Sequence, residues 1–357
     1  MPVAFAYLNA VGTAVPDHDI HQPFIDWARA RIDDPRQAAL FDRMAARSGI
    51  AHRWSVLDRT ADGGSPVMPG GFYADGMPGT AARMALYAEA APALGLAAIE
   101  ALRAQVPLDG ITHLVVASCT GFVAPGIDQI IAARLGLDPG VERLLIGFMG
   151  CYAAVTALRS ARHIVRSEPG ARVLVLTVEL SSLHLQDVHA IEPLLAALQF
   201  GDGAAAALVT GEPGGFALGH PFATTLPESD DLIRWTITDT GFAMHLSGEV
   251  PARIAAGLGD PDFARAATGG RAPAEIDGWA IHAGGRSILD AVEHALDLSS
   301  DALAASRGVL NDFGNMSSTT LMAVLARLLD GPRIANGVAL AFGPGLAAEG
   351  LGFSSAA

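Results

Sequence analysis

Short apolar runs and amphipathic segments alternate along the chain. The apolar runs have the length and composition of buried β-strands and cover residues 4–11, 113–118, 172–180, 204–209, 278–282 and 337–342. Between them, apolar residues recur with helical spacing at 80–104, 126–135, 151–167, 286–298 and 316–329. This alternation predicts an α/β fold with a largely buried sheet. The Gly- and Pro-rich stretch 62–79 has neither period and predicts a surface loop.

Two parts of the chain repeat one order of motifs. FGDGAAAALV, which begins at Phe200, is echoed by FGPGLAAEGL, which begins at Phe342, and each is a glycine turn before a strand of small residues. Repetition in the same order predicts a duplicated α/β unit whose halves are related by a pseudo-twofold axis. The Pro and Gly residues of GEPGG favour a boundary at 211–215, which gives an N-terminal half 1–213 and a C-terminal half 214–357.

The repeat places reactive side chains at equivalent points. One apolar strand ends at Cys119 and another at His282. At a similar distance beyond each, a glycine precedes Cys151 in GCYAAV and Asn315 in GNMSST, where a helix is predicted to begin. If the halves pack about the axis, a thiol, an imidazole and a carboxamide share one cavity, and that combination suits acyl transfer through a thioester. Taken alone, Cys151 is also consistent with a buried apolar filler.

Composition narrows the classes of function. Of the 357 residues, 51% are hydrophobic and 17% are charged, which predicts a large buried core. The formal net charge of −14 argues against nucleic acid as a partner. The basic side chains are all Arg, so Schiff-base chemistry, lysine-bound pyridoxal and a P-loop lysine are excluded.

The sequence has no motif for a metal or a nucleotide cofactor. His184 and His189 are too loosely paired for a metal site, and GDGAAA at 201–206 precedes an apolar strand, whereas a dinucleotide fingerprint follows one. No run reaches the length of a membrane span, and MPVAFAYLNAVG lacks the basic region of a signal peptide. With only two cysteines, we expect a cytoplasmic protein without a disulfide framework.

At the repeated motifs the chain resembles the type III polyketide synthases, the chalcone synthase-like branch of the thiolase-fold condensing enzymes. The similar motifs, in family order from about residue 43 to the end, are SCTGFVAPGID at 118–128, GCYAA around Cys151, FGDGAAA at Phe200, WAIHAGG around His282, GNMSS around Asn315 and FGPG at Phe342. The resemblance implies a thiolase-like αβαβα layered fold with two pseudo-twofold-related halves. It also implies a catalytic triad of Cys151, His282 and Asn315.

The implied roles agree with the chemistry of these groups. Cys151 would take an acyl group from a CoA thioester, and a helix N-terminus and a nearby imidazole would lower its pKa. His282 and Asn315 would donate hydrogen bonds to a thioester carbonyl. They would thereby stabilise the enolate that forms when malonyl-CoA loses carbon dioxide.

The resemblance further implies positions that bind substrate. Arg43 and Arg47, at i and i+4 on one predicted helical face, and Arg53 shortly after them would bind the CoA pyrophosphate, although Leu40 occupies a position that is basic in the family. Phe200 and Met244 would separate the CoA tunnel from the elongation cavity, with Met in place of a second Phe. The other implied substrate positions are Cys119, Trp235, Gly284, Gly285 and Ser317.

The implied enzyme is a homodimer that loads an acyl-CoA starter on Cys151 and extends it with malonyl-CoA by decarboxylative Claisen condensation. It would need no cofactor and no acyl carrier protein. Because Met244 is flexible, we expect aliphatic starters and cyclisation to an alkylpyrone, an alkylresorcinol or a related phenolic product. Two alternatives stay open: a ketoacyl-synthase III-like enzyme that uses acyl carrier protein, and a non-catalytic homologue that acts as a dimer partner. The sequence leaves the starter, the number of extensions and the cyclisation mode open.

Overall fold

The computed structural model describes residues 5–61 and 63–357. Its first part contains β1 (Tyr7–Ala14), β2 (His18–Asp19), α1 (His21–Arg29), α2 (Pro35–Ala46), β3 (Trp54–Ser55), α3 (Thr80–Arg103), β4 (His113–Ser118), α4 (Ile127–Leu135), β5 (Glu142–Gly147), α5 (Ala153–Ser167), β6 (Val173–Leu180), α6 (Ile191–Ala197) and β7 (Asp202–Thr210). Its second part contains β8 (Phe216–Thr225), β9 (Ile233–Thr238), β10 (Gly241–Leu246), α7 (Val250–Gly259), α8 (Pro261–Ala267), β11 (Gly278–Ile281), α9 (Arg286–Ala295), α10 (Ala304–Phe313), α11 (Ser318–Leu329), β12 (Gly337–Gly343) and β13 (Ala347–Ser355).

The main sheet has nine strands in the order β11-β12-β13-β8-β1-β7-β6-β4-β5. On one side, β4 pairs with β6 in parallel, and β6–β7 and β7–β1 are antiparallel. On the other side, β11 pairs with β12 in parallel, and β12–β13 and β13–β8 are antiparallel. The two sets therefore have the same order and directions, which confirms the duplicated fold predicted from the motifs. They join where β1 pairs briefly with β8.

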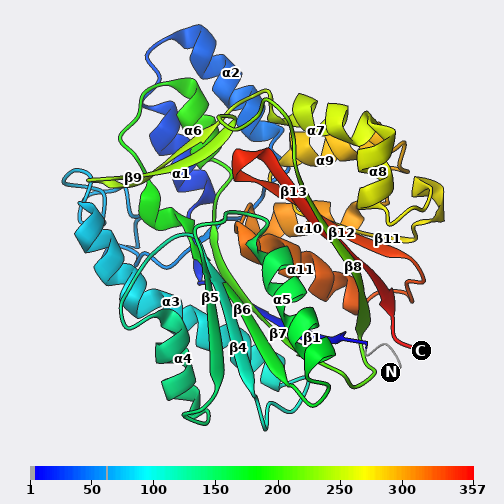
Figure 1. Ribbon diagram of the computed structural model, residues 1–357. Helices are drawn as coiled ribbons and strands as arrows, with labels where there is room; N and C mark the ends of the chain where they lie inside the picture. The colour runs from blue at the N-terminus through cyan, green and yellow to red at the C-terminus, as the bar shows by residue number, and fades with distance from the viewer. Residues whose placement is uncertain (1–4, 62) are drawn as a thin grey trace.

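Two central helices lie between the two sets of strands (Figure 1). Helix α5 packs against β4, β6 and β7 on one side and against β12 and β13 on the other, and α11 contacts β1, β6, β11 and β12. Helices α3 and α4 cover the outer face of the first set, and α7 and α9 cover that of the second. The layers are thus helix, sheet, helix, sheet, helix.

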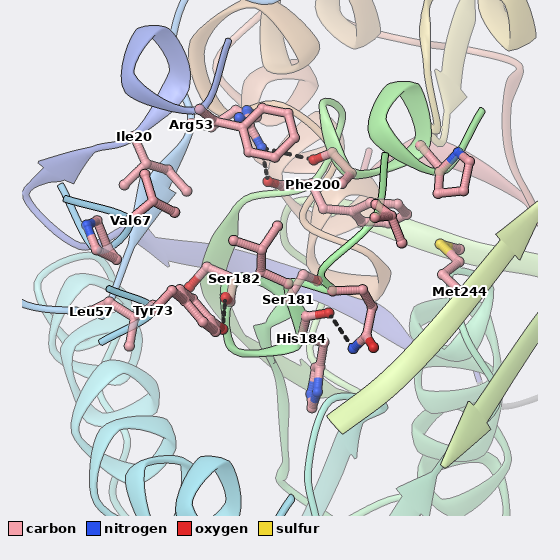
Figure 2. A pocket seen from close by; sticks show the side chains of 18 of the residues that line it. Ile20, Arg53, Leu57, Val67, Tyr73, Ser181, Ser182, His184, Phe200 and Met244 are labelled. Carbon is pink, nitrogen blue, oxygen red and sulfur yellow. Dashed lines mark hydrogen bonds between the residues drawn. The ribbon is translucent and has the colours of Figure 1, made fainter. Parts of the chain in front are cut away.

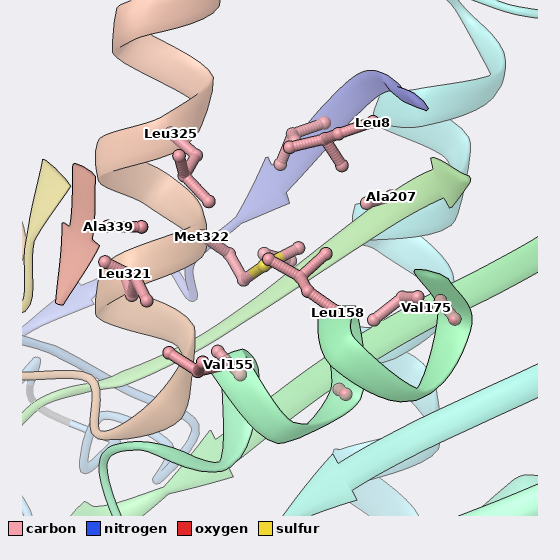
Figure 3. Close-up of a cluster of buried hydrophobic side chains, with 14 of the residues drawn as sticks. Leu8, Val155, Leu158, Val175, Ala207, Leu321, Met322, Leu325 and Ala339 are labelled. Atoms are coloured by element: carbon pink, nitrogen blue, oxygen red, sulfur yellow. The ribbon is translucent and has the colours of Figure 1, made fainter. Parts of the chain in front are cut away.

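The core between these layers is made of small and branched apolar side chains (Figure 3). Val155 and Leu158 from α5 and Met322 from α11 are fully buried among strand residues such as Ala207 and Ala339. Alanine on the strands lets both helices approach the sheet closely. This close packing fixes the positions of the turns that precede α5 and α11.

The predicted elements match the central layers. The run 113–118 coincides with β4, and β6, β7, β11 and β12 begin and end within two residues of their predicted bounds. The predicted strand 4–11 corresponds to β1, and residue 4 lies outside the described residues, as does residue 62 of the predicted loop 62–79. Helices α5 and α11 begin two residues later than predicted, which leaves the Cys151 and Asn315 turns outside them.

The expectation that no apolar run reaches the length of a membrane span is wrong. Helix α3 is long and apolar enough to cross a membrane by length and composition, because alanine and leucine fill much of it. In the structure α3 packs along β1, β6 and β7, with Tyr87, Ile99 and Leu102 buried in the cluster that it forms with the sheet. Its packing is that of a core helix.

Candidate active site

Cys151 lies in a tight turn between β5 and α5. The preceding Gly150 has a φ of 82°, which favours glycine, and a Cβ added there would lie 2.4 Å from the Cδ atom of Pro344. The FGPG turn therefore packs directly on the Cys151 turn, although 193 residues separate Gly343 from Gly150. Cys151 is buried, with 7% of its surface exposed.

A chain of contacts connects the three predicted catalytic residues. The hydroxyl of Ser317 donates to Cys151 Sγ at 3.8 Å, and the Ser317 N–H donates to Asn315 Oδ1 at 2.8 Å. Asn315 Nδ2 donates to the carbonyl of Gly284 at 3.1 Å, and the Gly284 N–H donates to the carbonyl of His282 at 2.9 Å. The structure thus brings together the thiol, the carboxamide and the loop that carries the imidazole.

The surrounding strands hold this site rigidly. His282 directly follows β11, and its N–H donates to the carbonyl of Leu340 on β12. The N–H of Asn315 donates to the carbonyl of Gln199, and Phe200 and Asn315 form an isolated parallel bridge. Gly285, also predicted at the site, packs so tightly that an added Cβ would lie 2.0 Å from Gln199 Oε1. The backbone of every predicted catalytic residue is therefore fixed by an element end or a turn.

The expected lowering of the thiol pKa is wrong for this site. Burial raises the pKa of Cys151 to about 12, outweighing the hydrogen bond from Ser317, and the charge of Glu179 raises it further. Burial also lowers the pKa of His282 to about 3. Both groups are therefore neutral near pH 7, and both ring nitrogens of His282 are buried without a hydrogen-bond partner among the described residues. A neutral imidazole offers one ring nitrogen as a hydrogen-bond donor and the other as an acceptor.

A buried acid that the sequence analysis did not single out lies beside the thiol. Glu179, at the end of β6, accepts from the Cys119 N–H, from the Thr120 hydroxyl and from the Ser318 hydroxyl. Burial raises its pKa to about 7. The sequence feature that could have revealed Glu179 is its position as the single charged residue in the run VLVLTVEL. Glu179 links the strand ends of the first half to the start of α11.

Cys119 also lies at this site, but its sulfur is occupied. Its Sγ accepts a hydrogen bond from the Gly150 N–H at 2.9 Å, and burial raises its pKa well above the usual thiol range. Cys119 thus supports the turn that presents Cys151.

An aromatic cluster borders the site. Trp235 on β9 is the direct cross-strand partner of Met244 on β10, and its ring packs edge-on against those of Phe200 and Phe242. Phe242, which was not predicted, stacks on His184 with ring centroids 4.1 Å apart. The wall opposite Phe200 is therefore more aromatic than Met244 alone suggested.

The predicted CoA-binding arginines separate into two groups. Arg43, on α2, and Arg47, at its end, are exposed, and the Arg47 carbonyl accepts a hydrogen bond from Arg286. Arg53 is only 2% exposed, so it does not lie on the exposed surface that carries Arg43 and Arg47. The reason is the turn at Gly49, where φ is 75°, after which the chain runs inward.

One group of possible metal ligands is found in the described part of the chain. It consists of His113, Glu142 and Glu168, whose ligand atoms lie within 4.8 Å of one another. Both carboxylates are exposed, and the group lies at the start of β4, at the other end of that strand from Cys119. It takes no part in the site around Cys151.

A buried thiol, an imidazole and a carboxamide at the meeting point of two α/β halves define a thioester-dependent acyltransferase site. The family model for the N-terminal domain of chalcone and stilbene synthases matches residues 3–213, and that for their C-terminal domain matches residues 218–357. The chain belongs to this family, the type III polyketide synthases, and is an acyltransferase.

Relatives and solved structures agree with this assignment. The chain is 32% identical over 367 residues to "Alpha-pyrone synthesis polyketide synthase-like Pks18" of Mycobacterium tuberculosis and of Mycobacterium bovis, covering 99% of this chain and 92% of the relative. The crystal structure of PKS-I from the brown alga Ectocarpus siliculosus superposes with a TM-score of 0.88 at 28% identity and covers 99% of both chains. The C-terminal type III polyketide synthase domain of Steely1 from Dictyostelium has the same fold, with a TM-score of 0.86 at 24% identity over 99% of this chain and 100% of that chain. The fold is the thiolase-like fold of these enzymes.

Proposed function

We propose that the enzyme loads an acyl-CoA starter on Cys151, extends it with malonyl-CoA and cyclises the product to an alkylpyrone or a related ring. The observation that carries this proposal is the chain of contacts from Cys151 through Ser317 and Asn315 to the His282 loop. The similarity to a relative named for alpha-pyrone synthesis supports the product class. Mass spectrometry of the products formed from malonyl-CoA and a panel of acyl-CoA starters tests this proposal. The same assay with malonyl-acyl carrier protein as the extender tests the alternative of a ketoacyl-synthase III-like enzyme.

The proposed steps follow from the protonation states in the site. Neutral His282 takes the proton of Cys151 as the thiol attacks the starter thioester, which forms an acyl-enzyme and releases CoA. The malonyl thioester then loses carbon dioxide, and its enolate oxygen accepts hydrogen bonds from His282 and Asn315 Nδ2. The enolate carbon attacks the acyl-enzyme carbonyl, and a carbon–carbon bond forms as Cys151 leaves as a thiolate. The proton removed in the first step has left with the CoA thiol, so the thiolate takes up a proton from solvent.

The CoA pyrophosphate is proposed to bind Arg43 and Arg47. Both are exposed on one helical face at the end of α2, and the Arg47 carbonyl accepts a hydrogen bond from Arg286. Arg43→Ala and Arg47→Ala should each raise KM for acyl-CoA about threefold to tenfold and change KM for N-acetylcysteamine thioesters little, because only CoA carries phosphate. Arg36→Ala, at the other end of α2, is the control. Equal changes for both kinds of thioester would contradict this assignment.

A flexible residue at position 244 is proposed to admit aliphatic starters. Met244 is partly buried beside Trp235 and can change rotamer more easily than a ring. We expect kcat/KM to rise with acyl chain length until the chain fills the cavity, because each buried methylene adds up to ~0.8 kcal/mol of binding free energy. Met244→Phe should shorten the preferred chain. Measurements from two to sixteen carbons test this, and a profile that the substitution leaves unchanged would refute it.

A homodimer is proposed from an exposed apolar surface. Phe122, Leu144, Leu145 and Phe148 are each 37–46% exposed and gather on and next to β5, the last strand of the sheet. Apolar patches of this kind are typical of protein interfaces. We expect a dimer in sedimentation equilibrium, and Leu145→Asp should shift it toward monomer. A wild-type monomer at micromolar concentration would exclude the proposal.

The boundary between the halves is proposed to lie within 211–215.

A further inference from the structure

A cavity of about 360 Å³ lies beyond Phe200 (Figure 2). Figure 2 shows Arg53 and Val67 on one side of it and Met244 on the other, with Ser181 between them. Trp235 borders this cavity and also a second one of about 280 Å³, whose lining includes Cys119 and Gly150, the residue before Cys151. Phe200 lines the larger cavity and its backbone forms a bridge with that of Asn315, so this cavity adjoins the predicted reaction centre. Its walls are mainly apolar, including Ile20, Phe24, Leu57, Leu185 and Val188.

Three residues that line this apolar cavity each carry a buried polar atom without a partner among the described residues. Arg53 Nη2, Ser65 Oγ and Ser181 Oγ are buried, and none has a hydrogen-bond partner among the described residues. All three residues line the cavity, and they are 2%, 3% and 7% exposed. Buried polar groups in proteins nearly always find a partner. Three such groups on residues that line one cavity favour a ligand that carries hydrogen-bond acceptors.

The charge around the cavity specifies the ligand further. The other side-chain bonds of Arg53 go to the carbonyls of Ala197 and Phe200 and to His21, so within the described chain no carboxylate binds its guanidinium. A second buried guanidinium, that of Arg83, lies 5.3 Å from the ring centroid of Tyr73 in the cavity wall and also bonds only carbonyls. A buried positive charge without a negative partner is costly. An anionic ligand would supply that partner.

The acids closest to Arg53 are already engaged. Asp19 accepts hydrogen bonds from His52 and from the backbone of Arg53 itself, and Asp202 accepts from Ser182 and the Val56 N–H. Asp187 in the cavity wall is exposed and pairs with Arg31. Burial lowers the pKa of Arg53 to about 9, which leaves it charged near pH 7.

We infer that this cavity binds acyl groups whose far end carries a carboxylate, with Arg53 as the partner of that carboxylate. The inference rests on the proposed function, because the near end of the chain is the thioester carbon carried by Cys151. The chain would enter past Phe200, whose backbone pairs with that of Asn315. Its methylenes would contact the apolar walls, and the hydroxyls of Ser181 and Ser65 would donate to oxygen atoms along or at the end of the chain.

The test compares suberoyl and octanoyl thioesters, which differ only in a terminal carboxylate or methyl group. Each is supplied both as the CoA ester and as the N-acetylcysteamine ester. Wild type should favour suberoyl by tenfold or more in kcat/KM. Arg53→Lys should keep part of this preference, and Arg53→Gln and Ser65→Ala should lower it by about tenfold each, the effect of losing one hydrogen bond to a charged group. Ser229→Ala is the control. It removes a buried hydroxyl that lies outside the cavity and donates a hydrogen bond to the Leu226 carbonyl, so the preference for suberoyl should persist.

The outcomes separate the possible explanations. No preference for suberoyl in wild type, or a preference that Ser65→Ala and Arg53→Gln both leave intact, overturns the inference. An effect of Arg53 on both CoA esters and on neither N-acetylcysteamine ester assigns it to the CoA phosphates and also overturns it. If wild type extends no starter, the proposed function fails. Calorimetry with free suberate and octanoate then tests the cavity alone: tighter binding of suberate that Ser65→Ala weakens supports the inference, and equal binding refutes it.

Discussion

Replacing Cys151 with alanine should abolish polyketide formation and leave malonyl-CoA decarboxylation measurable. Without the thiol no acyl-enzyme can form, so condensation should fall by ~10³-fold or more. His282 and Asn315 remain in place, because the Asn315 contacts with Ser317 and Gly284 do not involve the sulfur. Product mass spectrometry measures the first effect and release of acetyl-CoA from malonyl-CoA the second. Persistent elongation would exclude Cys151 as the nucleophile.

The unreacted thiol provides a second measurement. Because burial raises the pKa of Cys151 to about 12, the thiolate fraction increases with pH throughout the neutral range. Alkylation by iodoacetamide should therefore rise about tenfold for each pH unit from 6 to 9. Cys119, whose sulfur accepts the Gly150 N–H, should react more slowly in the same sample. A rate that levels off near pH 7 would indicate an ion pair with His282 instead.

The central strands and the site were predictable because both depend on local sequence patterns. The runs that became β4 and β6 are buried on both faces, so they read as continuous apolar segments. The Cys151 and Asn315 turns were found because the duplication repeats a glycine before each predicted catalytic residue. The apolar runs and the repeated glycine motifs can both be recognised in the sequence without knowledge of tertiary contacts.

The hairpin β9–β10 and the edge strand β5 were not predicted. Strand β5 is exposed at all but one of its positions, and β9 and β10 mix buried, half-buried and exposed positions without alternation, so none of them shows a clear period. The burial of Arg53 was missed for a related reason. Arg53 was grouped with Arg43 and Arg47 because it follows them closely in the sequence, whereas the Gly49 turn sends the chain into the core. Burial, and with it the raised thiol pKa, is a property of the whole fold.

Loss of the Asn315 amide should affect decarboxylation more than acylation. In the proposed mechanism Nδ2 donates to the enolate oxygen, and removing one such donor typically lowers the rate by ~10²–10³-fold. Asn315→Ala also removes Oδ1, which accepts the Ser317 N–H, so the turn itself would be weakened by about 1 kcal/mol. Asn315→Asp separates the two effects, since it keeps the acceptor and removes the donor.

Two assays on both variants distinguish the roles. We expect Asn315→Asp and Asn315→Ala to lose malonyl-CoA decarboxylation to a similar extent, while acylation of Cys151 by a starter that cannot be decarboxylated, followed by intact-protein mass spectrometry, continues in Asn315→Asp. His282→Gln should slow both steps, because the imidazole accepts the thiol proton in one step and donates to the enolate in the other. Decarboxylation at the wild-type rate in Asn315→Asp would show that the amide supports the Ser317 turn and does not contact the enolate.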